Sequence, residues 1–215
     1  MRTLLPWSLV LSAALATATA AGAPLTRAEA IAAIAHPQAN QRLAGVERLG
    51  EIGTQADAGR LVLRLADADQ KVRMFAVAAM WQIWSRSGDR EVDKLFARGL
   101  EQMQASAYDD ALLTFNQIVR RRPDFAEGWN KRATLYFLMG ENQKSLKDCD
   151  EVLKRNKLHF GAMSGAGQIH LQLGHPDRAL EFFRRAVDVN PNLEGPAQMI
   201  PLLEQHLRAK GRNAI

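Results

Sequence analysis

Residues 126–159 read AEGWNKRATLYFLMGENQKSLKDCDEVLKRNKLH, and the pattern of residue sizes in this segment recurs in the segment before it, 92–125, and in the segment after it, 160–193. Six positions keep their size class in all three copies, and no insertion separates the copies. They are Leu95, Trp129 and Met163; Gly99, Ala133 and Gly167; Ala111, Ser145 and Ala179; Phe115, Cys149 and Phe183; Ile118, Val152 and Ala186; and Pro123, Lys157 and Pro191. A fixed period of about 34 residues is the signature of a repeat architecture.

The order of residue types within each copy predicts two antiparallel helices. Small residues such as Ala133 and Ala179 let the two helices approach each other, and Gly140 and Gly174 end the first helix at a turn. Two helices cannot bury their apolar faces alone, so neighbouring copies must stack on one another. The pattern therefore predicts an extended array of helical pairs.

The period and the pair formed by Trp129 and Tyr136 resemble the tetratricopeptide repeat (TPR). The resemblance covers residues 92–193, which it divides into units 92–125, 126–159 and 160–193. It implies that the first helices of successive units line a concave groove that holds an extended peptide or a helix.

The second unit departs from the TPR pattern at three positions. Ser145 replaces the usual alanine, Cys149 an aromatic residue and Lys157 the terminal proline. We interpret Cys149 as a small buried hydrophobic residue, because its position belongs to the core. The alternative is a reactive or intermolecular thiol.

A second repeat, with a slightly shorter period, precedes the first. Residues 42–46 align with 73–77, and both segments have the apolar spacing of amphipathic helices. These features resemble HEAT-like repeats over residues 26–88. Two copies are too few to stand alone, so we expect them to pack directly onto the TPR array as one solenoid. An amphipathic helix and tail at 195–215 would cap the other end.

The sequence thus predicts an all-α, right-handed helical-repeat solenoid. Its parts are two HEAT-like helical pairs, three TPR units and a C-terminal capping helix. Trp81, Trp84 and Phe96 gather near the expected junction of the two repeat types. We expect them to form a buried seam, the alternative being an exposed aromatic recognition patch.

The start of the chain, residues 1–20, has the layout of a secretory signal peptide. Arg2 gives the positively charged n-region, an apolar h-region follows, and Ala18-Thr19-Ala20 is a cleavage site with small residues at its first and third positions. The alternative is an uncleaved membrane anchor, for which the run is short and rich in Ala, Ser and Thr. We therefore expect an exported protein, located in the periplasm.

Composition narrows the class of protein. Apolar residues make up 47% of the chain, which argues against disorder, and a single cysteine excludes an internal disulfide. No histidine pair with metal-ligand spacing, phosphate-binding loop or nucleophile motif is present. We accordingly predict no catalytic residues, no metal site, no cofactor and no enzymatic activity.

The basic residues exceed the acidic residues by 28 to 23, giving a net charge of +5. Residues 120–122 end a predicted helix, where cations complement its dipole. Further cations follow in the second unit, interleaved with acidic residues; they include Lys154, Arg155 and Lys157. These side chains are interpreted as a solvated helix face, with an acidic partner or anionic surface as the alternative; a nucleic-acid partner is not expected.

The TPR resemblance assigns the groove to one set of residues in each unit: Phe96, Leu100 and Met103 in the first; Asn130, Lys131, Thr134 and Phe137 in the second; Ser164, Gln168, Leu171 and Gln172 in the third. The TPR clamp for a C-terminal carboxylate uses a lysine and an asparagine in its first repeat, and a lysine and an arginine in its third. The corresponding positions here are Phe96, Leu100, Gly161 and Gly165, so that clamp is absent.

The sequence therefore predicts a non-enzymatic adaptor or scaffold of the bacterial envelope that binds a peptide or helix of a partner protein in the TPR groove. One alternative is a self-associating structural module, which would form homo-oligomers. Another is a regulatory subunit of an envelope enzyme that acts on the cell wall. No stable membrane insertion is expected after signal cleavage.

Overall fold

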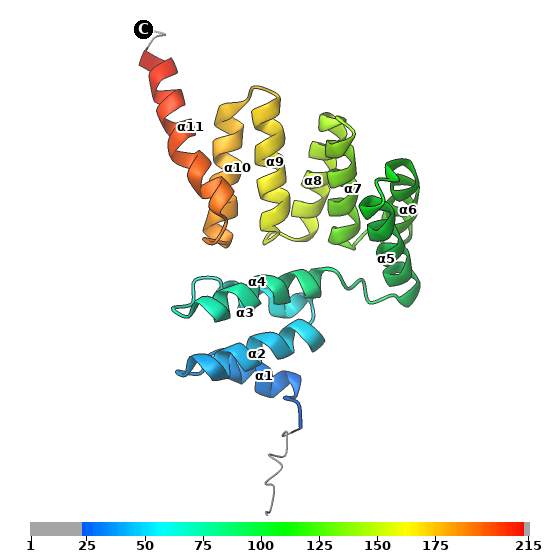
Figure 1. Cartoon of the computed structure of the whole chain (residues 1–215), viewed down its shortest axis with the longest axis vertical. Helices are drawn as coiled ribbons and strands as arrows, with labels where there is room; N and C mark the ends of the chain where they lie inside the picture. The colour runs from blue at the N-terminus through cyan, green and yellow to red at the C-terminus, as the bar shows by residue number, and fades with distance from the viewer. Residues whose placement is uncertain (1–22, 213–215) are drawn as a thin grey trace, which may run out of the picture.

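The computed structural model describes residues 23–212, and every regular element in this range is a helix (Figure 1). The elements are α1 (Arg27–Ala33), α2 (Ala39–Ile52), the 3-10 turn η1 (Gln55–Asp57), α3 (Ala58–Val62), α4 (Gln70–Trp84), α5 (Arg90–Gln104), α6 (Tyr108–Arg121), α7 (Ala126–Leu138), α8 (Asn142–Arg155), α9 (Phe160–Gln172), α10 (Pro176–Val189) and α11 (Glu194–Arg212). The predicted all-helical repeat fold is confirmed. The predicted signal peptide, residues 1–20, lies outside the described residues.

Helices α5 to α10 form three antiparallel pairs that stand side by side (Figure 1). The small residues of the repeat sit where the two helices of a pair cross. A Cβ atom on Gly99 would lie 2.6 Å from Cζ of Phe115, and one on Gly167 would lie 2.5 Å from Cε1 of Phe183. A side chain at either position would force the facing aromatic ring to move, which explains why the repeat holds a small residue there.

The turn inside each pair has the same backbone geometry. Ser106, Gly140 and Gly174 occupy equivalent positions of the three copies and have φ angles of 58°, 77° and 76°. This left-handed conformation closes a helix and strongly favours glycine. Ser106 is thus the one described residue other than glycine with a positive φ.

The last helix, α11, covers the outer side of α10. Leu203 is buried against Leu180 and Phe183, while Leu202 stays exposed. Pro201 lies inside this helix. The helix therefore covers apolar surface of the third pair that no further pair buries.

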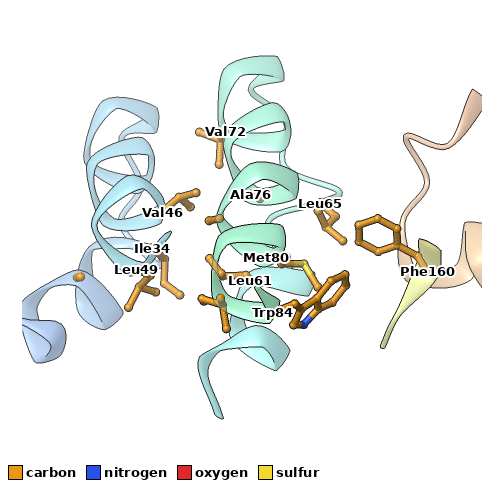
Figure 2. Packing of buried hydrophobic residues seen from close by; sticks show 13 residues of the cluster. Ile34, Val46, Leu49, Leu61, Leu65, Val72, Ala76, Met80, Trp84 and Phe160 are labelled. Atoms are coloured by element: carbon orange, nitrogen blue, oxygen red, sulfur yellow. The ribbon is translucent and has the colours of Figure 1, made fainter. Parts of the chain in front are cut away.

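The N-terminal unit, residues 27–84, consists of α1 to α4 and has its own apolar core (Figure 2). Leu49, Leu61 and Met80 are fully buried in it. Phe160, which begins α9, inserts into the same core beside Trp84. One core thus joins the N-terminal unit to the third helical pair. The likeness of this unit to HEAT repeats stays a prediction.

The sequence predicts that this unit packs directly onto the TPR array as one solenoid, and its observed placement is across the array instead (Figure 1). Helix α4 runs beneath the lower ends of the repeat helices, and the array returns above it (Figure 1). The Asn192 side chain, just before α11, donates a 2.7 Å hydrogen bond to the carbonyl of Leu65. The N-terminal unit therefore contacts the connections between the pairs rather than the face of the first pair.

The expected aromatic cluster is also divided. Trp84 is 2% exposed and stacks on His159, with ring centroids 4.6 Å apart; Trp81 meets the same ring edge-on. Phe96 instead packs against Phe115 and other residues of the first pair. The two tryptophans form a seam, as predicted. The prediction that Phe96 joins them is wrong, because the tryptophans pack against the start of α9 and Phe96 packs inside the first pair.

Candidate functional site

A hollow of about 280 Å³ lies between the inner helices α7 and α9, with α8 forming one wall. We call it the repeat groove. Its lining residues are Asn130, Ala133, Thr134, Phe137, Leu138, Ser145, Cys149, Gly161, Ala162, Gly165, Gln168 and Ile169. Apolar side chains and uncharged polar groups share this surface, and no acidic or basic residue contributes to it.

Two positions on the face of α9 that lines the groove are glycines. Gly161 and Gly165 are one helical turn apart and so lie on the same helix face. A Cβ atom on Gly165 would meet nothing within 4 Å, whereas one on Gly161 would lie 2.7 Å from Cη2 of Trp81. The Gly165 position is therefore open, and the Trp81 ring of the N-terminal unit lies against the other glycine.

Four of the predicted groove residues line this hollow: Asn130, Thr134, Phe137 and Gln168. Four others from the second and third units do not. Lys131 pairs with Glu127 and lies over the Trp81 ring. Leu171 packs against the core of the third pair, and Ser164 is half-buried. Gln172 accepts a hydrogen bond from Asn142.

The three predicted residues of the first unit lie elsewhere. Phe96 is 5% exposed and contacts the rings of Phe115 and Phe125. Leu100 and Met103 are partly buried against the same core. Their positions in the repeat predict that they lie on the concave face. In the structure, the Phe96 side chain is instead part of the core of the first pair. Phe96 therefore stabilises the fold and is not available to a partner.

Sequence reasoning missed most of the small lining residues. Among them are Ala133, Ser145, Gly161 and Gly165. The available signal was the pair of glycines at the positions where the TPR clamp carries basic side chains. Their lack of side chains removes the clamp and also opens the hollow.

Beside the groove lies a buried polar cluster centred on Glu127 and His159, which are 1% and 0% exposed. His159 Nδ1 accepts the backbone N–H of Ala162 at 3.0 Å, so the proton sits on Nε2, which donates to Glu127 Oε2 at 2.9 Å. Glu127 Oε1 accepts from Asn130 Nδ2 and lies 3.1 Å from Lys131 Nζ. The cluster connects α7 to the start of α9.

The environment keeps Glu127 ionised. Burial opposes its charge, but the hydrogen bonds from His159 and Asn130 and the nearby Lys131 ammonium outweigh that effect and hold the pKa of Glu127 below its ordinary value. A carboxylate beside an imidazole is a common acid–base pair in enzymes. Here both groups are buried, and the pair links α7 to the residue that precedes α9.

Cys149 lies in the wall of the groove and is 3% exposed. Burial, helped by the neighbouring carboxylates Asp148 and Asp150, raises the pKa of its thiol to about 12. The predicted burial of Cys149 is confirmed. A thiol with such a pKa stays protonated at neutral pH and is a poor nucleophile.

Within residues 23–212, no three His, Cys, Asp or Glu side chains are grouped so that they could hold a metal ion. No helix in that range is long and apolar enough to cross a membrane.

Comparison with known proteins identifies the repeats. The tetratricopeptide repeat family model matches residues 96–151 and 130–194. A TPR repeat-containing protein of Rhizobium etli is 31% identical over 124 residues, which are 58% of this chain and 61% of that protein. DnaJ homolog subfamily C member 3 of Homo sapiens is 29% identical over 129 residues and is covered over 26% of its length. Residues 96–194 therefore carry tetratricopeptide repeats, and the chain spans less than two thirds of these relatives.

Solved structures share the fold. The first TPR domain of Spaghetti, bound to an HSP90 peptide, superposes with a TM-score of 0.53 at 19% identity, covering 55% of this chain and 94% of that one. The Yersinia enterocolitica secretion chaperone SycD, in complex with a peptide of the translocator YopD, gives 0.52 at 14% identity, covering 55% and 95%. At such identities the likeness shows the fold alone.

Proposed function

We propose that the tetratricopeptide repeats over residues 96–194 make this protein a non-enzymatic adaptor, which binds a segment of a partner protein in the repeat groove. Similar TPR domains carry a bound peptide, in one case from HSP90 and in another from a translocator. The proposal rests on the open hollow between α7 and α9, because it is a concave surface of the kind that holds a peptide side chain.

The lining of the groove indicates what kind of segment it would take. Phe137 and Leu138 offer apolar contact, while the exposed Gln168 offers an amide group for hydrogen bonds to a peptide backbone. No charged side chain lines the hollow, so a charged partner residue would lose hydration without gaining an ion pair. The expected occupant is an apolar side chain on a segment whose backbone contacts the amide of Gln168.

We further propose that the protein acts in the bacterial envelope, in the periplasm. The support is the signal-peptide layout of residues 1–20. Amino-terminal sequencing of the protein recovered from envelope fractions tests this part separately. A mature chain starting at Ala21 or a few residues later supports export, and an intact Met1 in the cytoplasm overturns it.

The groove is tested by filling it. A leucine at Gly165 would project into the open hollow, whereas Gly59 on α3 also has open space around it but lies in the N-terminal unit. Peptides selected from a random displayed library on the wild-type protein are then measured against Gly165→Leu and the matched control Gly59→Leu. We expect a loss of affinity of at least about tenfold for Gly165→Leu alone, because the added side chain occupies the site.

The alternatives give other results. Peptides that bind both variants equally would show that binding occurs outside the repeat groove. If no peptide is selected and the protein sediments as a concentration-dependent oligomer, the self-associating module replaces the adaptor.

A further inference from the structure

A second concavity, of about 370 Å³, lies where the N-terminal unit meets the connections that precede α7 and α9. We call it the junction cleft. It is lined by Gln55, Ala58, Arg86 and Ser87 from the N-terminal side and by Arg122, Asp124, Phe125, Ala126, Arg155, Asn156, Lys157 and Leu158 from the repeats. It shares no lining residue with the repeat groove.

The charges of the junction cleft are not balanced. Arg122 pairs with Asp124 at 3.0 Å, and Arg155 pairs with Glu151 at 2.6 Å. Arg86 and Lys157 form no ion pair with any described residue. Two positive charges in the wall therefore lack a close carboxylate.

Arg86 is held in place although it has no ion pair. Its guanidinium donates to the carbonyl oxygens of Gly50 and Gly53, both at 2.7 Å. Burial lowers its pKa, an effect that the more distant Asp93 partly opposes. The positive group is thus fixed at the cleft wall, where an incoming anion would find it already oriented.

Lys157 departs from the repeat pattern of the sequence. It stands where the neighbouring copies have Pro123 and Pro191, and its side chain is exposed. The repeat pattern would place an uncharged ring at the edge of this cleft, and this chain places an ammonium group there. Asn156, next to it, has a buried Nδ2 with no hydrogen-bond partner among the described residues.

We propose that the junction cleft binds an acidic segment of a partner protein, with the carboxylates placed between Arg86 and Lys157. Its volume corresponds to about a dozen water molecules, which is more than one inorganic anion requires. Leu158 and Ala126 add apolar surface beside the cations, which suits side chains that flank an acidic residue. A segment bound here would contact both the N-terminal unit and the repeats.

The test measures binding of a fluorescent pentapeptide with two glutamates on each side of a leucine. Lys157→Glu reverses one charge of the cleft, and Lys147→Glu makes the same change at an exposed lysine of α8 that does not line it. Both lysines form no ion pair among the described residues, so both variants should stay folded, which thermal unfolding checks. We expect about a tenfold or greater loss of affinity for Lys157→Glu and little change for Lys147→Glu.

Three results would overturn the proposal. One is an equal effect of both variants, which would mean attraction by net charge only. Another is equal binding of the matched glutamine peptide. The third is displacement of the acidic peptide by millimolar inorganic phosphate at constant ionic strength, which would identify a simple anion site. Gly165→Leu should leave this binding unchanged, so failure of the repeat groove and failure of the junction cleft are distinguishable.

Discussion

Two glycines on α9 should respond differently to the same substitution. A Cβ on Gly165 meets nothing within 4 Å, whereas a Cβ on Gly167 would lie 2.5 Å and 2.6 Å from two ring carbons of Phe183. Both residues lie inside the helix, where alanine is more favourable than glycine by about 1 kcal/mol. The two alanine variants therefore share this gain and differ in the clash.

The magnitudes follow from the packing. Gly165→Ala should raise the free energy of unfolding by about 1 kcal/mol, because it adds helix propensity without a clash. Overpacking a core costs about 1–3 kcal/mol. After the gain in helix propensity of about 1 kcal/mol, the free energy of unfolding of Gly167→Ala should be between unchanged and about 2 kcal/mol lower than that of the wild-type protein. The two variants should thus differ by about 1–3 kcal/mol.

Urea denaturation followed by circular dichroism measures both values, and an unchanged slope shows that the comparison concerns stability. The wild-type protein is the reference in each case. Equal stability of the two variants, or a destabilised Gly165→Ala, would refute the distinction between an open groove at one glycine and a filled helix crossing at the other.

Three further outcomes are expected. Ser106→Gly should raise the free energy of unfolding by about 0.5–1 kcal/mol in urea denaturation, because glycine accepts the positive φ that serine holds there. The pKa of Glu127 lies below its ordinary value of 4.5 in the folded state, so the ionised side chain stabilises the fold above pH 4.5 and this stabilisation is lost as the pH falls further. The stability of Glu127→Gln should therefore fall less steeply with acidification than that of the wild-type protein. Identical pH profiles of the two proteins would contradict this. Cys149, whose pKa is about 12, should react with a thiol reagent at pH 8 only after unfolding, whereas fast labelling of the native protein would show an accessible thiolate.

The repeat array could be predicted from the sequence because its determinants are local and periodic. The small residue at Gly99 and the aromatic at Phe115 meet within one helical pair, and Gly167 and Phe183 repeat that contact in the third copy. The turn residues Gly140 and Gly174 mark the helix ends directly. Contacts between residues close in sequence recur in each copy, and they therefore produce a fixed period that can be seen in the sequence.

The placement of the N-terminal unit could not be predicted in the same way. It depends on long-range contacts, such as the bond from Asn192 to the carbonyl of Leu65 and the stacking of Trp84 on His159. Neither contact leaves a periodic pattern. Continuity of the chain suggested the first helical pair as the neighbour of Trp84, and the structure places it against the third.

The candidate groove was partly predictable. Helical position correctly placed Asn130, Thr134, Phe137 and Gln168 on the wall of the hollow. Whether a residue on the concave face is open or absorbed into a core depends on its neighbours in space. Phe96 shows this, because Phe115 and Phe125 enclose its ring.

The most direct test of the adaptor proposal is hydrogen exchange of the full chain with and without a selected peptide bound. The proposed site predicts slower exchange in α7 and α9, the inner helices that line the repeat groove. It also predicts that this protection disappears in Gly165→Leu. Protection confined to other helices, or the same protection in that variant, would contradict binding in the groove.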